Sequence, residues 1–169
     1  NLKWAKDILV LDKGSTDRTQ ELALKYTPNV VTIPFSDAGN GADYAEKLAK
    51  EEWIFSIVGS GLIHPRLIER IRPLLEDGNF PYDIIALPYK IFSLGIHSPY
   101  SPWYASHKHS LFRKSVFIPS NELHNEISFS SNRIYYLPWE DDDAVQYHLT
   151  HKNLDEFFEK HIRYTKYEA

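Results

Sequence analysis

The chain has 169 residues, of which 43% are hydrophobic and 25% are charged, and its formal net charge is −4. This length fits one domain with a sizeable core. The negative charge argues against a general nucleic-acid binder, and no apolar run approaches the roughly 18 residues of a membrane span. The sequence contains no cysteine, which excludes disulfides, thiolate metal sites and cysteine nucleophiles and fits a reducing compartment.

The first predicted element is an apolar strand at residues 8–11, which ends in Asp12 and is followed by turn residues. Four apolar residues between turn signals are typical of a strand buried on both faces in a parallel sheet. Asp17 with Gln20 predicts a capping box for the next helix. Ligands in open α/β sheets bind at the carboxyl ends of strands, so Asp12 lies where a nucleotide would bind. An ordinary strand–turn–helix with a capping aspartate explains the same residues.

Strands and helices then alternate along the first half of the chain. Strands are predicted at residues 30–33, 53–58 and 82–92, and Pro65 suits the first turn of a helix. This alternation with short connections predicts a parallel sheet with right-handed crossovers.

The second half of the chain differs from the first in composition and in the spacing of its apolar residues. Residues 93–103 are rich in proline and aromatics without periodicity, which is typical of a long functional loop. Asn153 can cap a last helix. Short antiparallel strands are predicted at residues 106–113, 122–129, 133–137 and 144–151, and the apolar side chains expected to face inward from the last helix are Leu154, Phe157, Phe158, His161 and Ile162.

The turn after Asp12 resembles a motif of a known family. Asp12-x-Gly-Ser15-Thr-Asp17 after an apolar strand is similar to the second-strand motif of family 2 glycosyltransferases. Residues 40–55 resemble the family's helix and strand that lead to its metal-binding Asp-x-Asp. Three later segments resemble the subgroup that builds lipopolysaccharide cores; they are residues 111–113, 124–126 and 160–165. The resemblance implies a GT-A-like three-layer α/β/α fold with a mixed, mostly parallel sheet. It implies a single domain at 1–169, with a nucleotide-binding half at 1–92 and an acceptor-side half at 93–169.

The family opens with a strand–helix unit, about 30 residues long, before the segment that matches residues 7–19. We therefore expect this chain to be a fragment or an incompletely recorded sequence, since it starts at Asn1 and contains no methionine.

The metal-binding Asp-x-Asp of the family falls on Val58 and Ser60, and the acidic residue that often follows falls on Gly61. None of these side chains can replace the carboxylates that hold Mg²⁺ or Mn²⁺ against a diphosphate. No metal site of the usual kind is therefore predicted. Two interpretations stay open. In one, Gly59, Ser60 and Gly61 bring backbone N–H groups to the diphosphate without a metal; in the other, the chain has lost catalysis.

The resemblance also gives candidate catalytic residues. Glu126 is the candidate base that takes the proton of the acceptor hydroxyl, and His124 would orient it or touch the diphosphate. Asp141, in the acidic run at 140–143, is the rival base, and Arg113 lies on the expected phosphate side. Histidines 107, 109, 148 and 151 offer transition-metal ligands as an alternative.

Together these residues predict a transferase that moves a sugar, with inversion, from a nucleotide-sugar donor to a hydroxyl of a glycan or glycolipid. Asp12 and Ser15 belong to the donor site, and the predicted partners are the nucleotide sugar and a glycan or glycolipid acceptor. We expect a cytoplasmic protein, with peripheral contact at the inner face of a membrane left open. The alternative is an inactive homologue that binds a sugar nucleotide or acts as a scaffold.

Overall fold

The computed structural model describes residues 2–33, 41–101, 104–119, 127–140 and 144–168. The chain divides into two compact units. Unit 1 consists of Asn1–Phe55, Pro81–Ile85 and His109–Tyr135, and unit 2 consists of Ser56–Phe80, Ala86–Lys108 and Tyr136–Ala169. The predicted division into a nucleotide half and an acceptor half stays a prediction.

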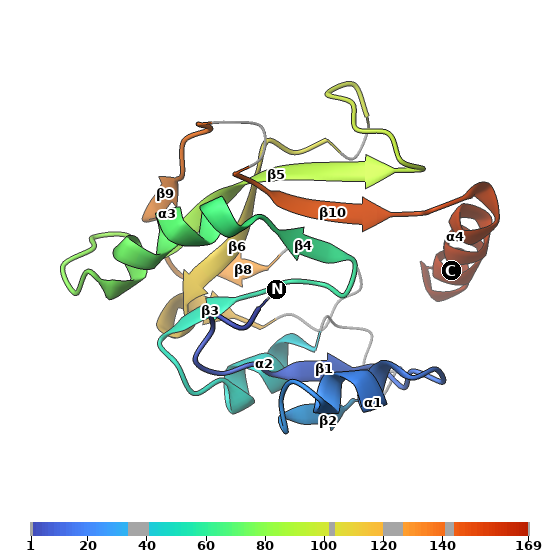
Figure 1. The fold of residues 1–169 in the computed structure, drawn as a ribbon, viewed down its shortest axis with the longest axis horizontal. Helices are drawn as coiled ribbons and strands as arrows, with labels where there is room; N and C mark the ends of the chain where they lie inside the picture. The colour runs from blue at the N-terminus through green and yellow to red at the C-terminus, as the bar shows by residue number, and fades with distance from the viewer. Residues whose placement is uncertain (1, 34–40, 102–103, 120–126, 141–143, 169) are drawn as a thin grey trace. The chain divides into compact units, whose positions relative to one another are not determined.

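Unit 1 opens with a parallel strand–helix–strand motif (Figure 1). β1 (Val10–Asp12) leads into α1 (Thr19–Leu24), and β2 (Val30–Thr32) returns parallel to β1 with Val10 opposite Val30. After α2 (Ala42–Leu48), β3 (Trp53–Phe55) pairs antiparallel with the unit 1 part of β6 (His107–Arg113).

One buried cluster of unit 1 contains Ile84, Phe112 and Phe117. The ring of Phe112 lies 5.2 Å from that of Phe117 and 5.1 Å from that of Phe129, measured between centroids. After β6 in the sequence, the 3-10 turn η1 (Lys114–Val116) leads into β7 (Phe117–Ile118). β7 pairs antiparallel with β8 (Ser128–Phe129). Aromatic side chains from these short strands thus pack against one another in the core of unit 1.

Unit 2 is organised around β10 (Gln146–Thr150), which lies between two strands. It pairs antiparallel with β4 (Gly61–Ile63), where Tyr147 lies opposite Leu62. It pairs parallel with β5 (Ile84–Ser93), where Tyr147 lies opposite Lys90. The short strand β9 (Ile134–Tyr136) spans the boundary between the units in the sequence.

Two helices of unit 2 test the predicted caps. α3 (Pro65–Glu76) starts at Pro65 as predicted and buries Leu67 and Ile71, one turn apart on one face. α4 (Leu154–Glu168) begins after Asn153, whose side-chain oxygen accepts a hydrogen bond from the Glu156 N–H at 2.9 Å, so the predicted cap is confirmed.

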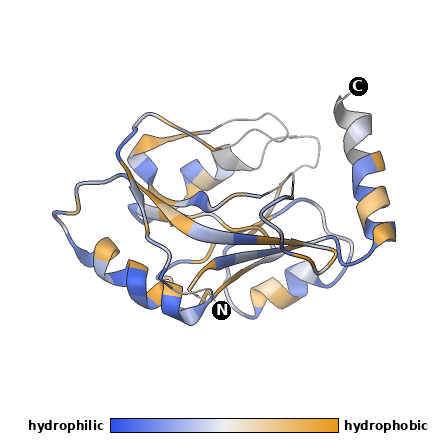
Figure 2. Cartoon of the chain, turned by 90° about the horizontal axis from the view of Figure 1, so that it is seen from above, coloured by the Kyte–Doolittle hydropathy of each residue, from blue (hydrophilic) through white to orange (hydrophobic). Residues whose placement is uncertain are grey.

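The prediction that all apolar side chains of α4 face inward is wrong in part. Leu154, Phe158 and Ile162 are each more than half exposed, and hydrophobic and hydrophilic residues alternate around this helix in Figure 2. Within the described ranges, none of the helices combines the length and apolar character needed to cross a bilayer.

The predicted GT-A-like three-layer α/β/α fold is wrong. The described residues form short strands in mixed sheets with four α-helices, and β3 pairs antiparallel with β6 instead of extending the parallel pair β1–β2. Parallel sheets are stable when helices cover both faces of strands that are buried throughout. Here α1 buries none of its residues, and β1, β2 and β3 are mostly half-buried. The apolar run at 8–11 therefore does not belong to a buried central strand, and the second half is not purely antiparallel either, because β10 runs parallel to β5.

A buried ion pair that the sequence analysis did not predict joins two segments of unit 1. Asp83 is 4% exposed, and its carboxylate accepts hydrogen bonds from Arg133 Nε at 2.8 Å and Nη2 at 2.6 Å. The Ser131 hydroxyl donates a third at 2.5 Å. The hydrogen bonds from Arg133, and to a smaller extent that from Ser131, lower the pKa of Asp83. Their effect is larger than that of burial, which raises it, so the pKa lies below its usual value.

We expect Asp83→Asn to lower the free energy of unfolding at pH 7 by about 2 kcal/mol, because it removes a charge-assisted bidentate pair. The lowered folded pKa means that this stability is present above the usual aspartate pKa and is lost as pH falls through the folded value. Urea denaturation at several pH values measures it. Asp77→Asn is the control, since Asp77 is exposed and accepts through Oδ1 from the Asn79 N–H, a bond that asparagine can also accept. Equal losses in both variants would contradict the assigned role of Asp83.

Candidate functional site

The turn between β1 and α1 folds back onto the carboxylate of Asp12, which is 4% exposed. Oδ2 accepts hydrogen bonds from the backbone N–H groups of Gly14 at 3.2 Å and Ser15 at 3.0 Å, and Oδ1 accepts one from the Ser15 hydroxyl. Gly14 has a φ of 81°, a left-handed conformation that glycine adopts without a steric penalty. Asp12 and Ser15, predicted together at the donor site, are therefore in direct contact.

Gln20 connects this turn to β2. Its Nε2 donates to Asp12 Oδ2 at 2.7 Å and to the Thr32 hydroxyl at 3.1 Å. The predicted capping box is therefore not formed: Asp17 accepts from the Thr19 N–H at 2.9 Å, while the Gln20 side chain is committed to Asp12. A side chain expected to cap its own helix instead joins α1 to both strands.

These hydrogen bonds keep Asp12 ionised. The Ser15 hydroxyl, followed by Gln20, lowers the pKa of Asp12 against the opposing effect of burial. The two oxygens already accept four hydrogen bonds from within the motif. The Asp12 carboxylate therefore holds the shape of the turn. The residues that follow in this turn, 15–18, are exposed.

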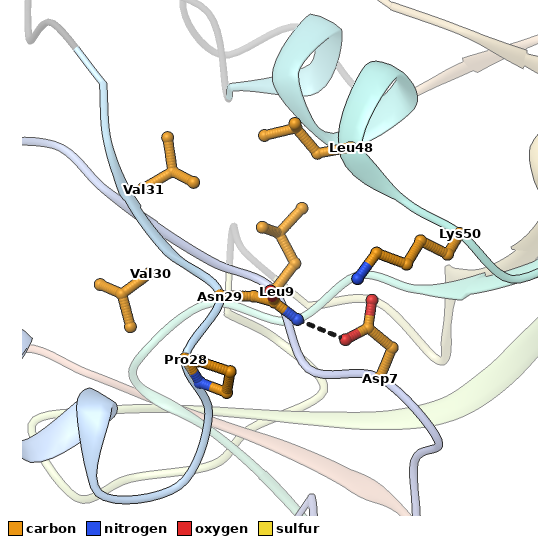
Figure 3. A pocket seen from close by; sticks show the side chains of 8 residues that line it. All are labelled: Asp7, Leu9, Pro28, Asn29, Val30, Val31, Leu48 and Lys50. Carbon is orange, nitrogen blue, oxygen red and sulfur yellow. Dashed lines mark hydrogen bonds between the residues drawn. The ribbon is translucent and has the colours of Figure 1, made fainter.

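A pocket of about 210 Å³ lies in unit 1 at the amino ends of β1 and β2, the opposite end from Asp12 (Figure 3). Asn29 Nδ2 donates to Asp7 Oδ1 at 2.6 Å along one side, and the ammonium group of Lys50 points toward Asp7. The pocket is smaller than the roughly 300–1,000 Å³ of typical small-molecule sites. Its lining residues are Asp7, Leu9, Pro28, Asn29, Val30, Val31, Leu48 and Lys50.

Gly59, Ser60 and Gly61, predicted to meet the diphosphate, form one turn in unit 2. Gly59 and Ser60 are exposed, and Val58 before them is 51% exposed. The Gly61 N–H donates to the Val58 carbonyl at 2.8 Å, and the Ser60 carbonyl accepts from the Leu149 N–H at 3.0 Å. The turn therefore uses one of the N–H groups proposed for phosphate contact to close itself.

Gly61 has a packing role that its sequence context did not suggest. A Cβ atom at this position would lie 2.5 Å from Cγ1 and 2.8 Å from Cδ1 of Ile57. A Cβ on Gly59 would meet nothing within 4 Å. The Ile57 side chain therefore leaves room only for glycine at position 61, whereas position 59 has space for a Cβ atom.

Arg113, predicted on the phosphate side, lies in unit 1 and is surrounded by protein groups. Its guanidinium lies 4.6 Å from the ring centroid of Trp53 and pairs with Glu52. Its Nε lies 3.7 Å from Asp83 Oδ1, and 17% of the side chain is exposed. Arg113 thus belongs to the ionic network of Asp83, and its contact with a phosphate stays a prediction.

The candidate catalytic residues Glu126, His124 and Asp141 lie outside the described residues. Within the described part of the chain, no three His, Asp or Glu side chains are grouped so that they could hold a metal ion. The histidines of the alternative metal set have other contacts. His107 lies edge-on to Tyr136 and Trp139, and His148 Nδ1 lies 2.7 Å from the Tyr89 hydroxyl.

No protein-family model matches this chain. The resemblance to family 2 glycosyltransferases therefore rests on the residues of the sequence motifs, and what it implies for function stays a proposal.

Some residues that shape the site regions could not be found by motif. Gln20 was expected only as part of a capping box and Arg133 belongs to no motif, yet Gln20 bonds to Asp12 and Arg133 to Asp83. Asp83 did carry a signal, because it directly precedes the apolar run at 84–87. An acid entering a buried strand needs a cationic or hydroxyl partner.

We expect Gly61→Ala to lower the free energy of unfolding by about 1–3 kcal/mol, because the new methyl group overpacks against Ile57. Gly59→Ala is the matched control and should change it by less than about 0.5 kcal/mol. Chemical denaturation of both variants measures the difference. If the two glycines tolerate alanine equally well, the packing assigned to Gly61 is incorrect.

Proposed function

We propose that this chain binds a nucleotide sugar through the β1–α1 turn of unit 1 and transfers the sugar to a hydroxyl of a glycan or glycolipid. The observation that carries this proposal is the parallel β1–α1–β2 motif with Asp12 and Ser15 at the carboxyl end of β1. Turns at this position, between a strand and a helix, are where α/β proteins bind nucleotides. The sequence motif of the resembled transferases falls on the same residues.

In this proposal Asp12 acts by holding the turn in shape. Its oxygens are occupied by Gly14, Ser15 and Gln20, so the nucleotide meets the exposed residues Ser15 to Arg18. Their hydroxyl and backbone groups offer hydrogen-bond partners to a nucleoside. The contact of Gly59–Gly61 with the diphosphate rests on the sequence resemblance alone.

The transfer step follows from the chemistry of inversion. An acceptor hydroxyl oxygen attacks C1 of the sugar, the bond between C1 and the diphosphate oxygen breaks, and the nucleoside diphosphate leaves with the bonding electrons. Glu126 takes the hydroxyl proton as general base. His124 orients Glu126, and Asp141 is the rival base. These three roles rest on the sequence resemblance alone.

A second candidate function is binding without catalysis. It is favoured by the position of Val58, which is exposed where the resembled enzymes carry a metal-binding carboxylate, and by the hydrogen bond that the Gly61 N–H makes within its own turn. A homologue of this kind would bind a sugar nucleotide, or a protein partner, as a scaffold.

Binding is tested by calorimetry with UDP-glucose, UDP-galactose, GDP-mannose and ADP-heptose in EDTA. We expect one of these donors to bind the wild-type chain. Asp12→Asn should weaken its binding by about tenfold, which corresponds to roughly 1.4 kcal/mol, because an amide cannot accept all four hydrogen bonds. Asp77→Asn is the control, since this exposed carboxylate in unit 2 accepts from the Asn79 N–H and has no part in the proposed site. Thermal melts verify that both variants are folded. If no donor binds, the assignment of the turn fails.

Catalysis is tested separately by following donor hydrolysis and transfer to a panel of glycans in EDTA. The transferase proposal predicts turnover that Glu126→Gln abolishes while donor binding is retained. Binding with no turnover in the wild type would instead support the inactive homologue.

A further inference from the structure

The pocket at the amino ends of β1 and β2 has no part in the proposed function. Its volume is about 210 Å³, and all of its lining residues belong to unit 1 (Figure 3). Aliphatic side chains line most of it, and its polar groups are those of Asp7, Asn29 and Lys50. We call this cavity the Asp7 pocket. It lies before β1, whereas Asp12 lies at the end of that strand.

The polar end of the Asp7 pocket is held in place by hydrogen bonds within unit 1. Asn29 Nδ2 donates to Asp7 Oδ1 at 2.6 Å. The backbone N–H of Asn29 donates to the Thr27 hydroxyl at 3.0 Å, and its carbonyl accepts from the Val10 N–H at 2.9 Å. The Thr27 hydroxyl in turn donates to the Ile8 carbonyl at 2.7 Å. The carboxylate and the amide are therefore fixed in position before a ligand arrives, which lowers the entropic cost of binding.

The Asp7 carboxylate can accept further hydrogen bonds from a ligand. Its two oxygens offer about four lone-pair sites, and the Asn29 amide uses one of them. In Figure 3 the other oxygen, Oδ2, points toward the side of the pocket where the Lys50 ammonium group lies. The pocket thus offers a charged acceptor and, beside it, a cationic donor. A ligand that matches both has neighbouring N–H donors followed by a carbonyl acceptor.

The remaining lining and the volume limit the ligand to a flat ring system. The aliphatic side chains that face it include Leu9, Val30, Val31 and Leu48. Such a surface favours ring faces that carry no hydrogen-bonding groups. An apolar cavity of about 150 Å³ is large enough for benzene, so the somewhat larger Asp7 pocket suits one or two fused rings. These properties together fit a purine base.

The order of donors and acceptors favours guanine among the purines. Its Watson–Crick edge presents N1–H and the N2 amino group as neighbouring donors, followed by the O6 carbonyl. The two donors match the Asp7 carboxylate, and O6 matches the Lys50 ammonium group. Adenine would instead turn the lone pair of its N1 toward the carboxylate, which is repulsive.

We propose that the Asp7 pocket binds the guanine base of a guanine nucleoside or nucleotide. Asp7 accepts hydrogen bonds from N1–H and the N2 amino group, and Lys50 donates to O6. The aliphatic side chains cover the faces of the base. This is a second site, separate from the β1–α1 turn proposed for the nucleotide sugar.

The test is a titration of the isotope-labelled full chain with guanosine, inosine and adenosine, followed by NMR of the backbone amides. We expect guanosine to cause saturable shifts of the Leu9, Val30 and Leu48 amides. Inosine lacks the N2 amino group and should bind about tenfold more weakly, because one charge-assisted hydrogen bond is lost. Adenosine should cause no saturable shift. The proposal is overturned if guanosine does not shift these amides saturably, or if either analogue binds as tightly as guanosine.

Variants show whether the polar groups recognise the base. Asp7→Asn should lower guanosine affinity by about tenfold and remove the preference over inosine, because an amide has only one accepting oxygen. If Asp7 were merely structural, its loss would weaken both nucleosides equally, which would contradict the proposal. Lys50→Gln should weaken guanosine binding by about fivefold. Lys47→Gln is the matched control, since Lys47 is exposed on α2 and does not line the pocket, and it should change affinity by less than about twofold.

Equal losses in the Lys47 and Lys50 variants would also overturn the proposal, and thermal melts verify that every variant is folded. GDP-mannose separates this site from the proposed donor site. Its binding at the turn depends on Asp12, whereas its binding in the pocket depends on Asp7. The two proposals can therefore fail separately.

Discussion

The hydrogen bonding of one buried carboxylate, Asp12, determines the local structure on which the functional proposal depends. A buried carboxylate is costly unless donors surround it. Here the donors are close in the sequence: Gly14 and Ser15 lie in the turn after Asp12, and Gln20 lies in α1. Because Gln20 also bonds to Thr32, one side chain joins the turn, the helix and the second strand. The strand, turn and helix are thus held together by polar contacts at one point, since α1 itself buries no residue.

The charged groups near buried titratable side chains differ between the two units. In unit 1, Asp83 is paired with Arg133 and lies near Arg113, so a buried acid is matched by cations. In unit 2, the charges that act on His148 are all of its own sign. Removing one partner of a matched buried pair such as Asp83–Arg133 leaves an uncompensated charge in the protein, which is costly.

Local signals in the sequence predicted local structure well. Pro65 at the start of α3, Asn153 at the cap of α4, and the strands near 84–93, 107–113 and 146–150 follow from turn chemistry and apolar patterns. Strand pairing did not follow, because three residues such as Trp53–Phe55 fit a parallel or an antiparallel neighbour equally well. The choice depends on distant residues, in this case β6. For the site, the motif assigned Asp12 and Ser15 to the same turn, but the hydrogen bonds from Ser15 to Asp12 were not predicted. The contacts of Gln20, and those between Tyr89 and His148, depend on which faces the strands present after pairing, so the sequence pattern alone could not reveal them.

The central claim, that Asp12 is an ionised anchor enclosed by its own turn, can be measured directly by NMR titration of its side-chain carboxyl carbon. The Ser15 and Gln20 hydrogen bonds predict a pKa below the usual aspartate value, together with a rise toward that value in Gln20→Ala. A carboxyl that titrates at or above the usual value, and does not respond to loss of Gln20, would contradict the account.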